Sequence, residues 1–242
     1  MISIFRSIFA PPRHLILLLA ALWIGLALAE RQAQKHGISQ DILSSLVYYA
    51  LFGYILGGRL FYTLSNCSAF LQSPLSVFSL NLDLFDPVAS LVVAVMVGVI
   101  YGSRQKFPLW PTLDVLTPLF ATIAIGLALS HLAAGTAFGS PTSLPWGMEL
   151  WNARRHPTQL YELGAALIIL GIIWFRKSDS PAGSSFLWFA ALTAAARLFL
   201  EAFRGDSTLI IGGLRLAQVV AWIVLAAALF LTDWIRRKGQ LA

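Results

Sequence analysis

Charge is scarce in this sequence. Only 12% of its 242 residues are charged, whereas a soluble domain carries about 25%. There is one cysteine, Cys67, so an internal disulfide is excluded, and no Cys/His spacing indicates a metal site. The lysines and arginines form only short clusters, which gives no indication of nucleic-acid binding. This composition therefore does not favour a soluble, disulfide-bonded or metal-dependent domain.

Long apolar runs take the place of charge. Hydrophobic residues make up 58% of the chain, and runs recur that approach or span a ~30 Å hydrocarbon core. We expect an all-α integral membrane protein, with residues 1–242 forming one polytopic domain. Its bundle of about seven transmembrane helices is expected at residues 15–29, 43–64, 84–102, 113–135, 158–175, 185–203 and 209–235. The first run also resembles a signal peptide with a cleavage site at Ala27-Leu28-Ala29, but six later runs predict a membrane protein in either case.

The distribution of basic residues predicts an orientation. With seven spans, the connecting segments alternate between the two sides of the membrane. All four lysines (Lys35, Lys106, Lys177 and Lys238) follow odd-numbered spans. The positive-inside rule places that side in the cytoplasm, with the N-terminus outside and the C-terminus inside.

Three charged residues interrupt the sixth run and its edge: Arg197, Glu201 and Arg204. At helical pitch their spacings of i, i+4 and i+7 place them on one face. A charge in hydrocarbon costs from ~2.5 to more than ~10 kcal/mol, so such residues face a bundle interior or an aqueous cavity. Because two arginines outnumber one glutamate, we expect a net positive charge that binds an anion.

Two further blocks place polar residues in apolar surroundings. Gly53 and Gly57 have the small-xxx-small spacing that lets membrane helices approach closely, and Arg59 follows at once. Its planar guanidinium suits phosphate. The block His156-Pro157-Thr158-Gln159-Leu160-Tyr161-Glu162 opens the fifth run, with Pro157 suited to a first helical turn. Gln159 and Glu162 can share a face there, while capping and interfacial anchoring also account for His156 and Tyr161.

Together these blocks resemble the bacterial phosphatidylglycerol–prolipoprotein diacylglyceryl transferases. The resemblance is carried by Gly57-Gly58-Arg59, the block from His156 to Glu162, Arg197-x-x-x-Glu201-x-x-Arg204, and Gln218. It implies a multi-pass enzyme of the bacterial inner membrane with its active site toward the periplasm. Such enzymes move a diacylglyceryl group from phosphatidylglycerol to the lipobox cysteine of a prolipoprotein signal peptide, and release glycerol phosphate.

The resemblance also implies roles for individual residues. Arg197 would hold the lipid phosphate, Glu201 would orient it and Arg204 would support it. The implied substrate-binding residues are Arg59, Arg204, His156, Gln159, Tyr161 and Glu162. Preorganised cations stabilise a departing phosphate, so we expect neither a metal nor another cofactor. A base must still deprotonate the incoming thiol, whose reference pKa is ~8.5.

Two family motifs differ here. The family's His-Gly-Gly-Leu block in span three is replaced by Phe85-Asp86-Pro87-Val88. Its Arg/Asn signature in span four is replaced by residues 128–136, which contain His131. His131 with a nearby carboxylate such as Asp86 is a candidate base; alternatively, His131 bonds within the bundle and Asp86 caps span three.

The sequence thus leaves three functions open. The first is diacylglyceryl transfer or a divergent related lipid transfer, and the second is a catalytically degenerate paralogue that only binds phospholipid. A transporter is less well supported, because neither repeat symmetry nor paired broken helices occur.

Overall fold

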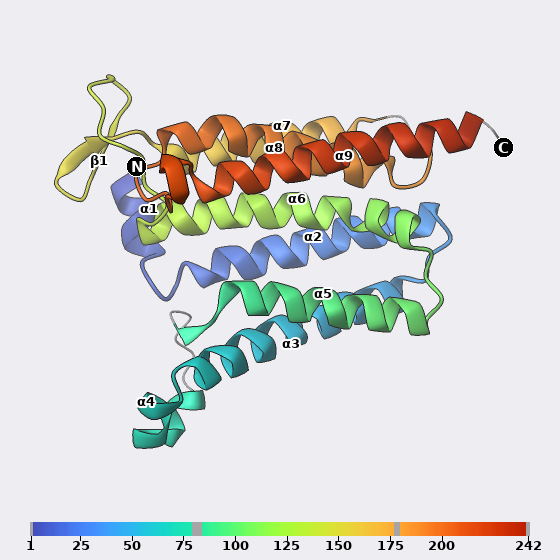
Figure 1. Ribbon diagram of the computed structural model, residues 1–242, viewed down its shortest axis with the longest axis horizontal. Coiled ribbons are helices and arrows are strands. Elements are labelled where there is room, and N and C mark those ends of the chain that lie inside the picture. The colour runs from blue at the N-terminus through green and yellow to red at the C-terminus, as the bar shows by residue number, and fades with distance from the viewer. Residues whose placement is uncertain (1, 79–83, 177–179, 241–242) are drawn as a thin grey trace. The chain divides into compact units, whose positions relative to one another are not determined.

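The computed structural model describes residues 2–78, 84–176 and 180–240 (Figure 1). Lys177, which entered the orientation argument, and residues 79–83 lie outside the described residues. The described helices and strands are, in chain order, α1 (Ile2–Ile8), α2 (Leu15–Lys35), α3 (Gln40–Ser65), α4 (Cys67–Gln72), η1 (Pro74–Phe78), α5 (Pro87–Arg104), α6 (Leu109–Ala134), β1 (Met148–Leu150), β2 (Ala153–Arg155), α7 (Thr158–Trp174), α8 (Ser184–Leu200), η3 (Glu201–Phe203), η4 (Ile211–Gly213) and α9 (Leu216–Gln240).

The chain is mostly helical, and six helical segments are long and apolar enough to cross a membrane. They are α2, α3, α5, α6, α9 and the continuous segment Ser184–Phe203, formed by α8 and η3. Helix α7 is apolar but shorter, with 17 residues. The all-α, multi-pass class is therefore confirmed, while the count of seven spans and the orientation of the termini stay predictions.

One expected helix start and one expected helical face were wrong, and both matter for the site. Helix α9 begins at Leu216 rather than at residue 209, because Gly212 and Gly213 adopt left-handed φ angles of 80° and 76° that end regular helix. Helix α8 ends at Leu200 and tightens into η3, after which Arg204 is extended (φ −76°, ψ 142°). Arg204 is consequently not a third residue on one α-helical face.

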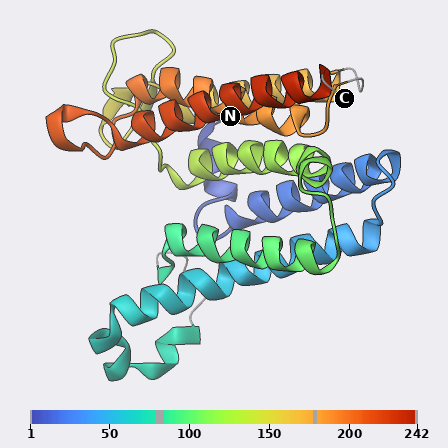
Figure 2. The same ribbon diagram turned by 45° about the vertical axis from the view of Figure 1, so that its right-hand side comes forward.

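The chain divides into two compact units, residues 1–32 with 113–242 and residues 33–112. In the first unit, α6 supplies much of the core, including the buried Val115, Leu119 and Ala128. Gly25 of α2 lies against the backbone of Leu119, so these two helices are in close contact. Helices α8 and α9 run side by side in both views (Figure 1, Figure 2).

The second unit is built on the pair α3 and α5. A Cβ added to Gly57 would lie 2.5 Å from Val93, and one added to Gly53 would lie 2.9 Å from Val97. The small-xxx-small spacing therefore serves helix packing here, as it does in other membrane helices. Asp86 caps α5 through a 2.7 Å hydrogen bond that its carboxylate accepts from the Ala89 N–H.

Within the first unit, loops join the start of α7 to the end of α8. The Ser140 N–H donates to the Phe203 carbonyl at 2.8 Å, and the Gly205 N–H donates to the Phe138 carbonyl at 2.9 Å. The His156 N–H donates to the Ser140 carbonyl at 3.0 Å. These bonds fix the backbone on both sides of Arg204, so an irregular segment rather than a helix positions its guanidinium.

Candidate active site

The Glu162 carboxylate joins the two arginines predicted from the sixth run. Its Oε1 accepts a 2.9 Å hydrogen bond from Nη1 of Arg197 and another 2.9 Å bond from Nη1 of Arg204. Glu162 lies one turn into α7, whereas the arginines come from the end of α8 and the segment after it. One oxygen thus connects three pieces of chain by charge-assisted hydrogen bonds, the stronger class.

Glu201 completes the contacts of Arg197 on its other side. Its Oε2 lies 2.9 Å from Nη2 of Arg197, and the Glu201 side chain is 1% exposed. The Arg215 guanidinium supports the same turn by donating to the carbonyls of Glu201 and Arg204 and to the Ser207 hydroxyl. Arg197, Glu201 and Arg204 therefore do come together, and Glu162 and Arg215 join them.

The two arginines differ in how many donors they have left. Arg204 gives Nε and Nη2 to the Asp206 carboxylate at 2.9 Å each and Nη1 to Glu162, and it is only 12% exposed. Burial lowers the pKa of Arg204, but Glu162 and Asp206 raise it more, and the net shift is upward. The side chain of Arg197 is 35% exposed and has further N–H donors. Arg197 is therefore the arginine that can receive a ligand.

The expected surplus of positive charge is not what the structure has. Glu162 and Asp206 bring two further carboxylates to the arginines, and Arg215 adds one guanidinium. The positive and negative charges of the group then cancel. An anion would be attracted by the directed N–H groups of Arg197 rather than by net charge.

His131 is placed beside this group. Its Nδ1 lies 3.9 Å from Oε2 of Glu162, which is longer than a direct hydrogen bond. The carboxylate near His131 is thus Glu162, whereas Asp86 was the one expected. Asp86 caps α5, which was the alternative interpretation of that residue.

The remaining residues of the His156 block divide into two sets. His156 and Tyr161 join Phe203 in an aromatic cluster with ring centroids 5.1 to 6.3 Å apart, and the Trp146 indole donates to the Tyr161 hydroxyl at 2.8 Å. Gln159 is buried, and its Nε2 donates to the Thr136 carbonyl at 2.7 Å. Gln159 therefore holds the loop before α7.

Arg59 lies in the second unit and has structural neighbours. It is 6% exposed, and its guanidinium donates to the carbonyls of Leu84, at 3.1 Å, and Ser76. The rings of Phe70 and Phe85 flank it at 5.7 and 5.5 Å. These contacts tie the end of α3 to the segments that follow it, and a role for Arg59 in binding substrate stays a prediction.

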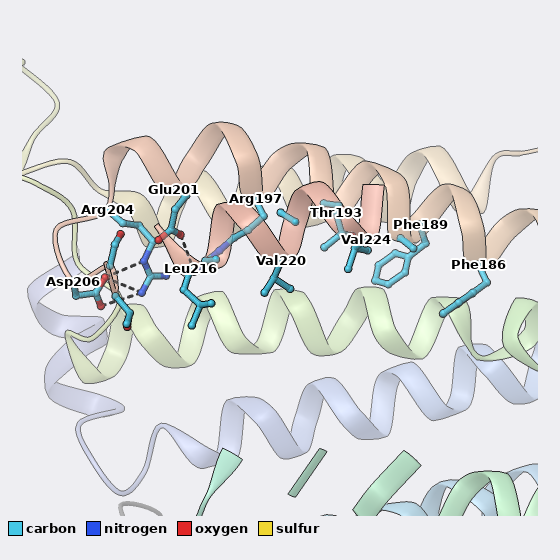
Figure 3. A pocket seen from close by; sticks show the side chains of 16 residues that line it. Phe186, Phe189, Thr193, Arg197, Glu201, Arg204, Asp206, Leu216, Val220 and Val224 are labelled. Carbon is cyan, nitrogen blue, oxygen red and sulfur yellow. Dashed lines mark hydrogen bonds and ion pairs between the residues drawn. The ribbon is translucent and has the colours of Figure 1, made fainter. Parts of the chain in front are cut away.

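A groove of about 650 Å³ leads away from the arginines between α8 and α9. Figure 3 shows Arg197, Glu201, Arg204 and Asp206 at one end and Phe186 and Phe189 toward the other. The walls between them are small or branched residues, among them Ala190, Ala194, Val220, Ala221 and Val224. A charged end with an apolar extension suits an amphiphile.

Two residues of the network, Asp206 and Arg215, were not predicted from the sequence. Asp206 stands only two positions after Arg204, and this proximity was a usable signal that the pattern of spans obscured. Arg215 comes eleven residues after Arg204, and nothing in the sequence indicates that it reaches back to two carbonyls. Gln218 was part of the resemblance, and its Nε2 donates to the Leu198 carbonyl at 3.3 Å.

Comparison with known proteins adds an independent finding. The sequence model of the family described as prolipoprotein diacylglyceryl transferase matches residues 13–234. The chain belongs to this family. Proteins named phosphatidylglycerol–prolipoprotein diacylglyceryl transferase include one from Acaryochloris marina, which is 29% identical over 91% of this chain and 85% of its own length. Others are from Gloeobacter violaceus, 29% identical over 96% and 91%, and Clostridioides difficile, 25% identical over 93% and 91%.

Membership of the prolipoprotein diacylglyceryl transferase family bears on the two departures noted above. Residues 85–88 and 128–136 both lie inside the matched range, so the family match extends across them. The network of Arg197, Glu162 and Glu201 consequently belongs to a chain that is related to the family throughout, rather than at one motif.

Proposed function

We propose that this protein transfers a diacylglyceryl group from phosphatidylglycerol to the cysteine thiol of a prolipoprotein. The observation that carries the proposal is Arg197, whose accessible guanidinium is held by two carboxylates at the head of an apolar groove. A family relationship over residues 13–234 supports the same chemistry. The groove and the charged head together fit an anionic glycerophospholipid.

In the proposed reaction the sulfur of the cysteine thiolate attacks a glycerol carbon. A carbon–sulfur bond forms while the bond from that carbon to the phosphate oxygen breaks, and glycerol phosphate leaves with the electron pair. The Arg197 N–H groups stabilise the charge that grows on this phosphate. Glu201 and Glu162 orient Arg197, and Arg204 holds Glu162 in place, so that little rearrangement is needed during transfer.

The thiol proton goes to His131 in this proposal. Histidine is the side chain that most often accepts a proton in catalysis, and Glu162 at 3.9 Å is placed to stabilise the imidazolium that forms. His156 and Tyr161 lie at the same end of the unit, where an aromatic cluster can contact the glycerol headgroup or the prolipoprotein signal peptide around its lipobox cysteine. Gln159 contributes by fixing the loop that leads into α7.

The protein in this proposal spans the bacterial inner membrane seven times, with α7 counted as a span. The positive-inside rule then assigns the lysines to the cytoplasmic side. The N-terminus and the Arg197 site then face the periplasm, and the C-terminus faces the cytoplasm.

Expression in bacterial cells depleted of their own transferase tests the proposed function. We expect restored lipoprotein modification from the unchanged chain and from Arg154→Ala, an exposed arginine outside the network. Arg197→Ala and His131→Ala should fail to restore it at equal protein level. Absence of rescue by the unchanged chain, together with no transfer of labelled lipid in membranes, would refute the proposal.

A phospholipid-binding paralogue without activity is the second candidate, and the altered residues 85–88 and 128–136 favour it. It predicts phosphatidylglycerol bound to the purified protein, lost in Arg197→Ala, with no transfer to any peptide. The two functions therefore differ in turnover rather than in binding.

A further inference from the structure

The groove between α8 and α9 has a defined length. Arg197 and Phe186 both line it, and at 1.5 Å per residue along α8 they are separated by about 16 Å. A hydrocarbon core of ~30 Å consists of two leaflets, so one lipid acyl chain extends for about 15 Å. The distance from the phosphate-binding arginine to the phenylalanine is thus close to the length of one chain.

The far end of the groove is lined by two aromatic rings, Phe186 and Phe189, and a third ring supports both. Phe120 of α6 contacts Phe186 with ring centroids 6.0 Å apart and Phe189 with centroids 6.3 Å apart. Asp114 of α6 accepts the Phe186 N–H at 2.9 Å and the Gly183 N–H at 2.6 Å, which holds the first turn of α8. Rings supported from behind in this way can act as a rigid stop.

The walls explain why a groove is left open. Ala190 and Ala194 are four residues apart on α8, and Ala217 and Ala221 are four apart on α9. Small residues at this spacing let membrane helices approach, but here they line free volume. The head of the groove holds cationic Arg197, and its remainder is largely apolar, so an acyl chain of an anionic glycerophospholipid is the occupant that matches both parts.

We propose that Phe186 and Phe189 set the acyl-chain length of the lipid that this protein accepts. The inference rests on the proposed function for the identity of the lipid class, and it adds which lipids are selected. Lipid tails are as apolar as the groove, so burial itself gives little affinity. The discrimination is steric: a chain that is too long must bend or displace a ring held by Phe120, and a chain that is too short leaves contacts unmade.

The test changes the groove length in both directions. Phe189→Ala removes part of the stop and should favour longer chains, whereas Ala190→Phe adds a ring about one turn nearer to Arg197 than Phe186 is and should favour shorter ones. Matched controls are Phe230→Ala, a phenylalanine on the exposed face of α9, and Ala195→Phe, at an exposed position of α8. Neither control residue lines the groove.

Each protein is purified from vesicles that contain equal amounts of dilauroyl, dipalmitoyl and diarachidoyl phosphatidylglycerol, and the bound lipid is quantified by native mass spectrometry. We expect the long-to-short ratio to rise about tenfold in Phe189→Ala and to fall about tenfold in Ala190→Phe, the lower end of what one methylene confers in an apolar pocket. The controls should keep the ratio of the unchanged protein. Because the two variants alter the groove in opposite senses, misfolding of one leaves the other as a test.

An unchanged ratio in the folded variants would overturn the proposal, and so would equal shifts in the controls. Binding is measured without transfer, so this result is separate from the fate of the proposed function. A selective shift in bound lipid without any diacylglyceryl transfer would support the length stop and count against the enzyme activity.

Discussion

Two arginines that the sequence placed in lipid-embedded helices, Arg197 and Arg59, are held in different ways. Arg197 contacts two carboxylates, is one-third exposed and opens onto a groove. Arg59 is 6% exposed, donates to two backbone carbonyls and lies between two phenylalanine rings. The same residue type in the same kind of helix thus serves one site that can bind and one that joins segments of backbone.

The difference teaches what distinguishes a binding arginine in a membrane protein. Carboxylates orient the guanidinium while leaving some of its donors directed at open space, so an anion can be added. Backbone carbonyls and aromatic rings that enclose a guanidinium instead serve as its binding partners themselves and leave no room for an anion. Accessible donors, rather than burial or net charge, are therefore the feature to test.

The largest effect is expected from Arg197→Ala. Loss of a preorganised cation at the departing phosphate should lower the transfer rate about 10²- to 10³-fold, measured with labelled phosphatidylglycerol and a lipobox peptide. Arg197→Lys keeps the charge but not the planar fork, and one lost charge-assisted bond of about 1.5–3 kcal/mol should leave it about 10- to 100-fold slow. Equal activity of the lysine and alanine variants would contradict a role that depends on charge.

The second-largest effect on transfer is expected from Glu162→Gln. The amide has nearly the same shape but no charge, so both arginines lose the carboxylate they share, and Arg197 is no longer held in place. Breaking a buried ion pair costs about 3–5 kcal/mol, and partial exposure of Glu162 should reduce this to about 2 kcal/mol in the unfolding free energy. We expect transfer to fall by about 10²-fold through kcat, with lipid binding less affected.

The same substitution at Glu149, an exposed carboxylate on β1, provides the control for Glu162→Gln. It should leave thermal stability and transfer unchanged. If Glu162→Gln lowered only stability, with full activity per folded molecule, then Glu162 would be a structural tie like the partners of Arg59.

A smaller effect is expected from Arg204→Lys, since Arg204 acts through Glu162 and Asp206 rather than on phosphate. Loss of its bidentate contact with Asp206 should lower kcat about tenfold and leave KM almost unchanged, in line with about 1.5 kcal/mol for one charge-assisted bond. The double variant Arg204→Lys/Asp206→Asn should be little worse than either single variant, because the two residues are in one contact. Full additivity would show that they act independently.

The sequence was enough to predict the helical membrane class and the central residues of the site. Charges in apolar runs are costly, so Arg197 and Glu201 stood out at once. The sequence did not show how distant chain segments meet: Glu162 reaches Arg197 because α7 packs against α8, and hydrogen bonds of the loop around Ser140 join the start of α7 to the end of α8. Hydrogen bonds between irregular segments have no periodicity, so neither the shared Glu162 carboxylate nor the support from Arg215 was evident.

Helix ends were the other limit of the sequence. The apolar run from residue 209 reads as a helix, but two glycines with positive φ delay α9 until Leu216 and create the turn that brings Arg215 to its carbonyl partners. Hydropathy reports which residues prefer lipid and carries little information about where backbone geometry changes.

The smallest effect on transfer, and a large one on stability, is expected from Arg59→Met. Methionine fills the space between Phe70 and Phe85 but leaves the carbonyls of Ser76 and Leu84 without this donor, which should lower the unfolding free energy by about 2–4 kcal/mol. Phosphatidylglycerol binding and transfer per folded molecule should stay within about twofold, because the donors lost were directed at backbone. Thermal unfolding in detergent and native mass spectrometry separate the two quantities. An unchanged melting temperature with loss of bound lipid would place Arg59 in the same class as Arg197, and enclosure by carbonyls and rings would then no longer distinguish the two kinds of arginine.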